Sequence, residues 1–321
     1  MNTRNYAGNL SSGLTGANAV RGPSPQLWGG CPVSDFKEDP SKGMYFFDDF
    51  MLAGNADMSS AYKNSIGQWS VYGYAGAVEA DGTAEGGVLK IGANDDQEGV
   101  ALQSAAGAFR MVTTSTLALN GKLWFECRIA RSTVATLTGD IFAGLMTPNL
   151  SSNLPRAAYP ITATDDTLAT SGDFFGFHLT SSSGTRGGPT EAAVAFELAS
   201  GTVNYPTNLT TLLASTGNSV LTAGTFVKLG FLFDPFAAPK MISAATARQT
   251  VGTVRKALIR FFVNGIEAPT FLTTDDVQNA TAAQAFPTGF MSPVLAVMNT
   301  AGSSPITLNI DWVRVAQAAN S

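Results

Sequence analysis

The feature of this sequence that most constrains its fold is a long succession of short apolar stretches, separated by segments rich in Gly, Ser, Thr, Asn and Pro. Many of the stretches alternate with a period of two, which is the side-chain period of a β-strand. In residues 122–130 one face carries Leu123, Phe125, Cys127 and Ile129, and the other carries Lys122, Trp124, Glu126 and Arg128. The separating residues are those that turns require, so we predict an all-β chain.

Alternating and nearly continuous apolar strands both occur. Residues 227–233 alternate, whereas residues 257–263 are apolar on both faces. About a dozen strands with both patterns are typical of two stacked antiparallel sheets, so we predict a two-sheet antiparallel β-sandwich. The dipeptide Asn264-Gly265 is the strongest hairpin-turn signal in the chain.

Residues 1–40 differ from the rest of the chain. They are rich in Gly, Ser, Asn and Pro, show no sustained period, and cannot bury enough apolar surface to form a core. We predict an extended N-terminal arm over residues 1–40 and one domain over residues 41–321. Trp28 either docks on a partner or packs on the arm's own domain. The candidate partner-contact residues in the arm are Leu10, Leu14, Val20, Leu27 and Trp28.

Charge and cysteine content disfavour several classes of protein. Only 13% of the residues are charged and the net charge is −5, so nothing attracts nucleic acid. The first residues lack the apolar core of a signal peptide, and no stretch is long enough to span a bilayer. We expect a protein made in a reducing cytoplasm, with no membrane partner, in which Cys31 and Cys127 are not bridged.

Eight segments, in this order, resemble the concanavalin A-like (laminin G-like) jelly roll of the type found among tailed-phage virion structural proteins. The likeness covers roughly residues 44–317 and implies that the terminal strand pairs beside the opening strand, closing the sandwich. The segments are FFDDFM, WFECRIA, IFAGLM, DFFGFHL, VKLGFLFDP, IRFFVNG, SPVLAVMNTAG and LNIDWVRVAQ.

The residues needed for catalysis are missing. The sugar-cleaving branch of this fold uses two Glu flanking an Asp at alternate positions of one strand, and no such run occurs. Glu126 stands alone beside Arg128, with which we expect an ion pair, and Glu197 has no second acid in register. His178 lacks the surroundings of a nucleophile–histidine–acid triad, and we expect a structural histidine. We predict no catalytic residue and no enzyme.

Metal and cofactor sites have as little support. One His and two distant Cys do not make a zinc site, and glycine-rich phosphate loops are absent. Asn94, Asp95, Asp96 and Glu98 form the densest oxygen cluster and are a weak calcium candidate, although acidic pairs in turns usually cap the turn. We predict no cofactor and no bound metal.

Low charge, the arm, the missing catalytic set and the resemblance together favour a virion structural protein on the capsid surface. It would be a decoration or cement protein that attaches to the phage major capsid protein through its arm and self-associates as a dimer or trimer. The alternative is a carbohydrate-binding, lectin-like module of a phage tail or host-recognition device, which would bind a glycan. Its candidate exposed aromatic residues are Trp69, Tyr72 and Tyr74.

Overall fold

The structure is a computed structural model of the whole chain. It describes residues 21–51, 56–57, 63–74, 76–81, 87–95, 98–104, 107–112, 120–134, 139–148, 172–180, 192–197, 204–208, 221–236, 239–241, 254–273, 286–299 and 305–319.

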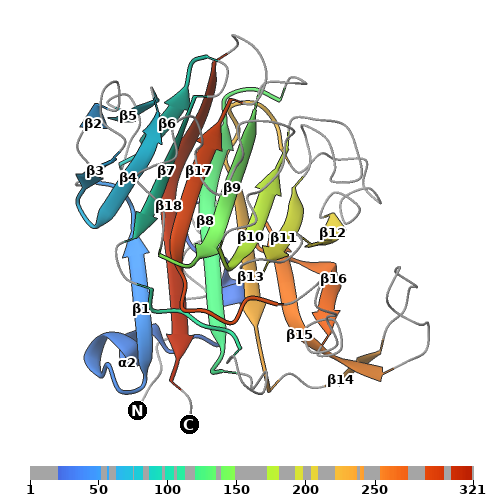
Figure 1. The fold of residues 1–321 in the computed structure, drawn as a ribbon. Coiled ribbons are helices and arrows are strands. Elements are labelled where there is room, and N and C mark those ends of the chain that lie inside the picture. The colour runs from blue at the N-terminus through green and yellow to red at the C-terminus, as the bar shows by residue number, and fades with distance from the viewer. Residues whose placement is uncertain are drawn as a thin grey trace, which may run out of the picture.

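Within the described residues the chain forms two antiparallel sheets that face each other as a sandwich (Figure 1). We call the larger one sheet A. Its main path runs in the order β14 (Pro239–Met241), β15 (Val254–Val263), β13 (Val227–Phe233), β8 (Leu123–Arg131), β18 (Ile306–Ala318), β6 (Leu89–Ala93), β5 (Ala77–Ala80) and β2 (Ala56–Asp57). Two further strands join it, since β1 (Gly43–Asp48) pairs with β18 and β16 (Ile266–Thr273) pairs with β15.

The second sheet, sheet B, has the order β12 (Asn204–Asn208), β11 (Ala193–Glu197), β10 (Phe174–Leu179), β9 (Asp140–Met146), β17 (Ser292–Met298), β7 (Gly99–Ser104), β4 (Trp69–Tyr74) and β3 (Lys63–Ile66). Neighbours in this order are often distant in the sequence, as with β9 and β17. The predicted all-β, two-sheet sandwich is therefore confirmed.

The core lies between the two sheets and is dominated by aromatic side chains. Phe231 is central: its ring stacks on Phe125 at 5.0 Å and meets Phe175 edge to face at 4.8 Å. The predicted alternation of β8 is observed, because Leu123, Phe125, Cys127 and Ile129 all belong to this core. The opposite side chains of β8 are buried too, which a strand facing solvent would not show.

The last strand closes the sandwich beside the first, as the resemblance implied. β1 runs antiparallel to β18, with Asp48 opposite Val313. The pairing of β18 with β8 is shifted between Ile310 and Trp312, so that Asp311 is the extra residue of a β-bulge. Asn264 and Gly265 both have positive φ angles, 50° and 83°, and turn β15 into β16, which confirms the predicted hairpin.

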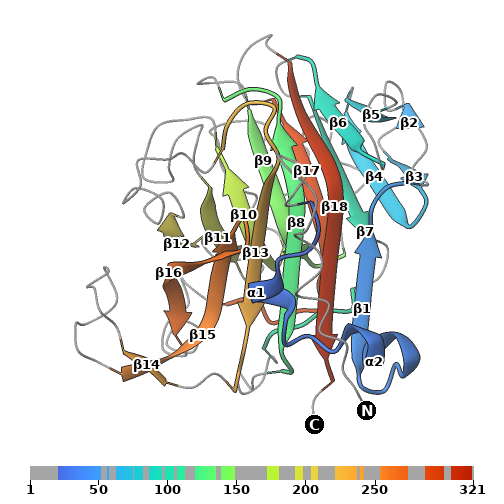
Figure 2. The same ribbon diagram turned by 180° about the vertical axis from the view of Figure 1, so that it is seen from behind.

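The described part of the predicted arm contains two short helices, α1 (Pro25–Trp28) and α2 (Val33–Glu38), which the sequence did not indicate. Figure 2 shows α1 on the outer face of sheet A, in front of β13 and β8. Leu27, Trp28 and Phe36 are buried there against Trp124 and further side chains of sheet A. Residues 21–40 thus pack on the sandwich instead of extending from it.

Candidate functional site

A pocket of about 310 Å³ opens where β1 ends, beside the turn that joins β3 to β4. β1 contributes Phe47 and Asp48, and the segment after it contributes Asp49 and Phe50. The β3–β4 turn contributes Gln68 and further residues on either side of it. The remaining lining residues are Ile66, Gly67, Trp69 and Leu89.

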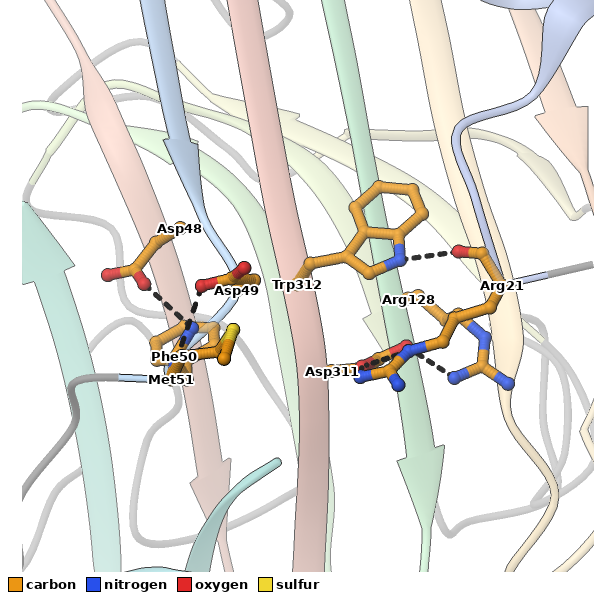
Figure 3. Close-up of polar contacts among 8 residues, drawn as sticks. All are labelled: Arg21, Asp48, Asp49, Phe50, Met51, Arg128, Asp311 and Trp312. Atoms are coloured by element: carbon orange, nitrogen blue, oxygen red, sulfur yellow. Dashed lines mark hydrogen bonds and ion pairs between the residues drawn. The ribbon is translucent and has the colours of Figure 1, made fainter. Parts of the chain in front are cut away.

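A pair of carboxylates holds the backbone at the pocket rim (Figure 3). Asp48 Oδ1 accepts a hydrogen bond from the Phe50 backbone N–H at 2.8 Å, and Asp49 Oδ1 lies 3.4 Å from the Met51 nitrogen. These bonds support Phe50 in the left-handed region, with φ of 56°, which a bulky residue rarely adopts. Gly87 packs against the same turn, and a Cβ there would lie 2.6 Å from the Asp49 carbonyl oxygen.

The other oxygen of Asp48 ties the rim to the β3–β4 turn. Asp48 Oδ2 accepts hydrogen bonds from Trp69 Nε1 at 2.6 Å and from Gln68 Nε2 at 2.9 Å. The Trp69 ring stacks on Phe50 at 5.6 Å and is buried. Asp48 is therefore a structural acceptor, whereas Asp49 has the less engaged carboxylate.

The aromatic side chain that a ligand would meet is Phe47, which is 41% exposed. Its side chain and the exposed Gln68 amide border the same cavity as the half-buried Asp49 carboxylate. The sequence singled out Trp69, Tyr72 and Tyr74 instead. Trp69 is a core residue, Tyr72 is half-buried on β4, and the Tyr74 side chain lies outside the described side chains.

A second polar arrangement covers the outer face of sheet A. We call residues 21–28 the N-terminal strap. The Arg21 guanidinium donates to the Asp311 carboxylate, with Nε 3.0 Å from Oδ1, and the Arg21 carbonyl oxygen accepts from Trp312 Nε1 at 2.7 Å (Figure 3). Arg128 of β8 donates to the second oxygen of Asp311. Asp311 is completely buried, and at the β-bulge the consecutive side chains of Asp311 and Trp312 both contact Arg21.

The strap is also anchored on β8 and β13. Glu126, completely buried on β8, accepts hydrogen bonds from the Ser24 N–H at 3.0 Å, the Ser24 hydroxyl and Trp28 Nε1 at 2.7 Å. Lys228 Nζ donates to the Gly22 carbonyl oxygen at 3.0 Å. These contacts make the outer face of sheet A an interior surface.

Burial raises the pKa of Glu126, while the hydrogen bonds from Ser24 and Trp28 and the positive charge of Lys228 oppose that rise. Burial lowers the pKa of Lys228, opposed by the negative charge of Glu126. The two groups therefore stabilise each other's charged form in a poorly solvated place. A buried acid that is already bonded to three donors is not available to a substrate.

One sequence-based expectation needs correction here. Glu126 accepts hydrogen bonds from Ser24 and Trp28, and Arg128 pairs with Asp311, so the expected Glu126–Arg128 ion pair is wrong. Leu27 and Trp28, predicted as partner contacts, are 1% and 7% exposed on the chain's own sheet, because sheet A offers Gly230 and Glu126 to receive them. The other predicted contact residues, Leu10, Leu14 and Val20, lie outside the described residues.

The single histidine is a buried, partnered residue, as expected. His178 is on β10, and its Nε2 lies 2.9 Å from Asp140 Oδ2 of β9, with both side chains fully buried. Glu197 ends β11, and its side chain lies outside the described side chains.

The calcium candidate proves to be a capped turn in its described part. Glu98 Oε2 accepts hydrogen bonds from the backbone nitrogens of Asn94 and Asp95, each at 3.0 Å. Asp96 lies outside the described residues. Across the described ranges no group of three or more His, Cys, Asp or Glu is placed to hold a metal ion. Likewise, none of the helices described is long and apolar enough to cross a membrane.

The two cysteines lie on opposite sides of sheet A. Cys127 is buried between the sheets, and Cys31 packs at the edge of the cluster under the N-terminal helices. Burial raises the pKa of the Cys31 thiol to about 12 and raises that of Cys127 further.

The fold resembles several solved structures. Basic winged bean lectin with Tn-antigen shares 10% identity at a TM-score of 0.46, covering 86% of this chain and 99% of the lectin. Peanut lectin with a nine-residue peptide shares 11% sequence identity at a TM-score of 0.44, and the match covers 87% of this chain and 100% of the lectin. A Shewanella oneidensis protein of unknown function shares 11% sequence identity at a TM-score of 0.45, and the match covers 90% of this chain and 94% of that protein. No protein-family profile and no curated protein sequence matches the chain.

Proposed function

We propose that this protein is a carbohydrate-binding module and that the pocket beside Phe47 is its glycan site. One observation carries the proposal: an exposed aromatic ring, an exposed amide and a half-buried carboxylate border a single cavity of about 310 Å³. Small-ligand sites are typically apolar concavities with a few placed polar groups. A sugar needs an apolar surface for its C–H face and donors and acceptors for its hydroxyl groups.

Charge narrows the class of glycan. The described residues that line the pocket include Asp48 and Asp49 and no Lys or Arg. An anionic sugar would meet two carboxylates in a partly desolvated site, so we expect neutral or amino sugars to bind and sialic or uronic acids to be rejected.

The test is a glycan array followed by titration of the best ligand against the full-length protein. Phe47→Ala and Gln68→Ala should each weaken binding by about tenfold or more, which corresponds to the loss of one good contact. The matched control is Phe236→Ala, because Phe236 is also an exposed phenylalanine, at 69%, and does not line the pocket. Binding that survives Phe47→Ala unchanged would overturn the assignment of this site.

We further propose that binding occurs without cleavage. The buried carboxylates Glu126 and Asp311 would be candidates for catalytic acids. Both are covered by the N-terminal strap and accept hydrogen bonds from its residues or from Arg128. Turnover of the bound glycan, measured as new reducing ends, would contradict this part of the proposal.

A virion role is the second candidate, and the resemblance of the opening FFDDFM and closing LNIDWVRV segments to phage structural proteins is what favours it. In that case the capsid contact would come from residues 1–20 or from the sandwich surface, since residues 21–28 are anchored on sheet A. Cosedimentation of the protein with phage capsids tests it. Residues 1–20 can be deleted without touching the strap, and full capsid occupancy by that variant would exclude them as the attachment arm.

A further inference from the structure

The side-chain donors of the pocket beside Phe47 are already in use. Among the described residues that line it, only Gln68 and Trp69 carry a side-chain N–H group. Trp69 Nε1 and Gln68 Nε2 both donate to Asp48 Oδ2, at 2.6 and 2.9 Å. The Gln68 amide nitrogen also lies 3.5 Å from the Phe47 carbonyl oxygen. A ligand in the pocket therefore meets no uncommitted side-chain donor among these residues.

What the pocket offers a ligand is a set of acceptors. Because the Gln68 amide nitrogen faces Asp48, Oε1 is the atom of that amide left to accept a hydrogen bond. The Asp49 carboxylate is half-buried, and the described residues give its Oδ1 one long contact, of 3.4 Å with the Met51 nitrogen. A carboxylate has about four lone-pair sites, so Asp49 keeps most of its capacity to accept. The pocket thus favours a ligand group that supplies several donors.

The charge of the pocket favours a cationic ligand group. The ion pairs of the described residues involve neither Asp48 nor Asp49, and the two groups that donate to Asp48 are neutral. Two neighbouring negative charges at the rim of a concave site therefore have no cationic partner among these residues (Figure 3). Opposite charges attract more strongly in such a partly desolvated place than in bulk water. The exposed Phe47 ring adds the negative face of a π-system, which also attracts cations.

We propose that Asp49 makes this pocket selective for glycans with a free ammonium group, such as oligomers of 2-amino-2-deoxyglucose. The inference rests on the glycan site proposed above and names its class of sugar. A primary ammonium supplies three donors, no acceptor and one positive charge, which matches the acceptors and the charge of the pocket. Its hydrogen bond to Asp49 is charge-assisted, and such bonds are roughly twice as strong as neutral ones.

Two related sugars fit the same position less well. An N-acetylated amine has lost its charge, and its carbonyl oxygen needs a donor that the side chains of the pocket have already committed to Asp48. A hydroxyl group in place of the amine keeps one donor but has no charge. The three sugars differ only in this substituent, so comparing them isolates its contribution to binding.

The test is a calorimetric titration of the full-length protein with three β-1,4-linked oligomers of equal length, built from glucosamine, N-acetylglucosamine or glucose. The titrations are made at about pH 6, below the pKa of about 7.7–8.0 that α-amino groups show, so that the sugar amine is protonated. We expect the glucosamine oligomer to bind about tenfold or more tightly than the other two. Phe47→Ala should weaken the binding of all three, because each presents a sugar ring to this side chain.

Asp49→Asn separates the selectivity from the glycan site itself. The variant keeps the size of the side chain and an oxygen for the Met51 nitrogen but removes the charge. The three oligomers should then bind with affinities within about threefold of one another. The matched control is Asp95→Asn, which removes the same charge from an exposed position outside the pocket and should leave the preference of wild type intact.

Each result decides between the selectivity and the site. Equal binding of the three oligomers to wild type, or a preference that survives Asp49→Asn, would overturn the ammonium selectivity and leave the glycan site standing. If none of the three oligomers binds while another glycan of the array does, the selectivity is likewise wrong. If no glycan binds at all, the proposed function fails together with it.

Discussion

The ion pair of Asp311 offers a direct test of how the strap holds the sandwich together. Asp311 is fully buried and receives both Arg21 and Arg128, whose side chains are 35% and 7% exposed. Asp311→Asn keeps the shape of the side chain but removes the charge and turns one acceptor into a donor that faces a guanidinium. Breaking a buried pair by removing one partner typically costs about 3–5 kcal/mol. Because solvent screens Arg21, we expect the lower end, about 3 kcal/mol.

The measurement is urea unfolding followed by circular dichroism. The free energies of unfolding are compared between proteins whose dependence on urea concentration has the same slope. The matched control is Glu79→Gln, which breaks the Lys90–Glu79 pair, whose two side chains are 42% and 48% exposed. An exposed pair contributes about 0–1 kcal/mol, so the control should be nearly neutral. If Asp311→Asn costs less than about 1 kcal/mol, the Asp311 contact is no stronger than a surface pair and the strap is held mainly by its apolar contacts.

Three further predictions concern the buried Glu126, two glycines with positive φ and the two cysteines. Because burial raises the folded-state pKa of Glu126, its contribution to stability is present below its unfolded pKa and is lost as pH rises through the folded pKa. Melting temperatures measured across that range should therefore fall with pH in wild type relative to Glu126→Gln, and the opposite trend would contradict the burial argument. Gly67→Ala should cost about 1 kcal/mol, since only its positive φ matters. Gly87→Ala, with the same kind of φ and a backbone clash, should cost more in urea unfolding and also abolish glycan binding; equal costs would refute the clash. Cys31 and Cys127 should react with a thiol reagent only slowly at pH 8 in native protein and fully in denaturant, since the thiolate is the reactive form.

The sandwich could be predicted from the sequence because its signals are local and repeated. The alternation of Leu123, Phe125 and Cys127 predicts which face of β8 packs in the core, and Asn264-Gly265 predicts the position of one hairpin turn. Such patterns depend on neighbouring residues alone. The burial of the other face of β8 was not predictable in this way, since it depends on a segment about a hundred residues earlier.

The pocket and the strap could not be derived from the sequence, for two different reasons. Phe47 lies in an apolar stretch whose sequence does not distinguish an exposed aromatic residue from a core one, and its exposure follows from the position of β1, which pairs with β18. The strap has no periodic pattern because its contacts are made one by one with side chains of β8, β13 and β18. Its only sequence sign was a scatter of apolar residues, which fits docking on a partner and docking on the own domain equally well.

The pocket and the N-terminal strap are connected through one pair of strands, and two strap variants test whether this connection affects glycan binding. Phe47 lies opposite Arg314 in the pairing of β1 with β18, and the Arg314 guanidinium stacks on the Trp28 ring of the strap at 4.2 Å. A strap that leaves the face removes one of the two rings that Arg314 contacts, the other being Tyr45 of β1 at 5.3 Å, and we expect this loss to loosen β1 beside the pocket. Arg21→Ala weakens the strap without touching this stack, whereas Trp28→Ala removes it. Glycan affinity should therefore fall in Trp28→Ala more than in Arg21→Ala if the stack transmits the effect, and equally in both if strap release alone matters.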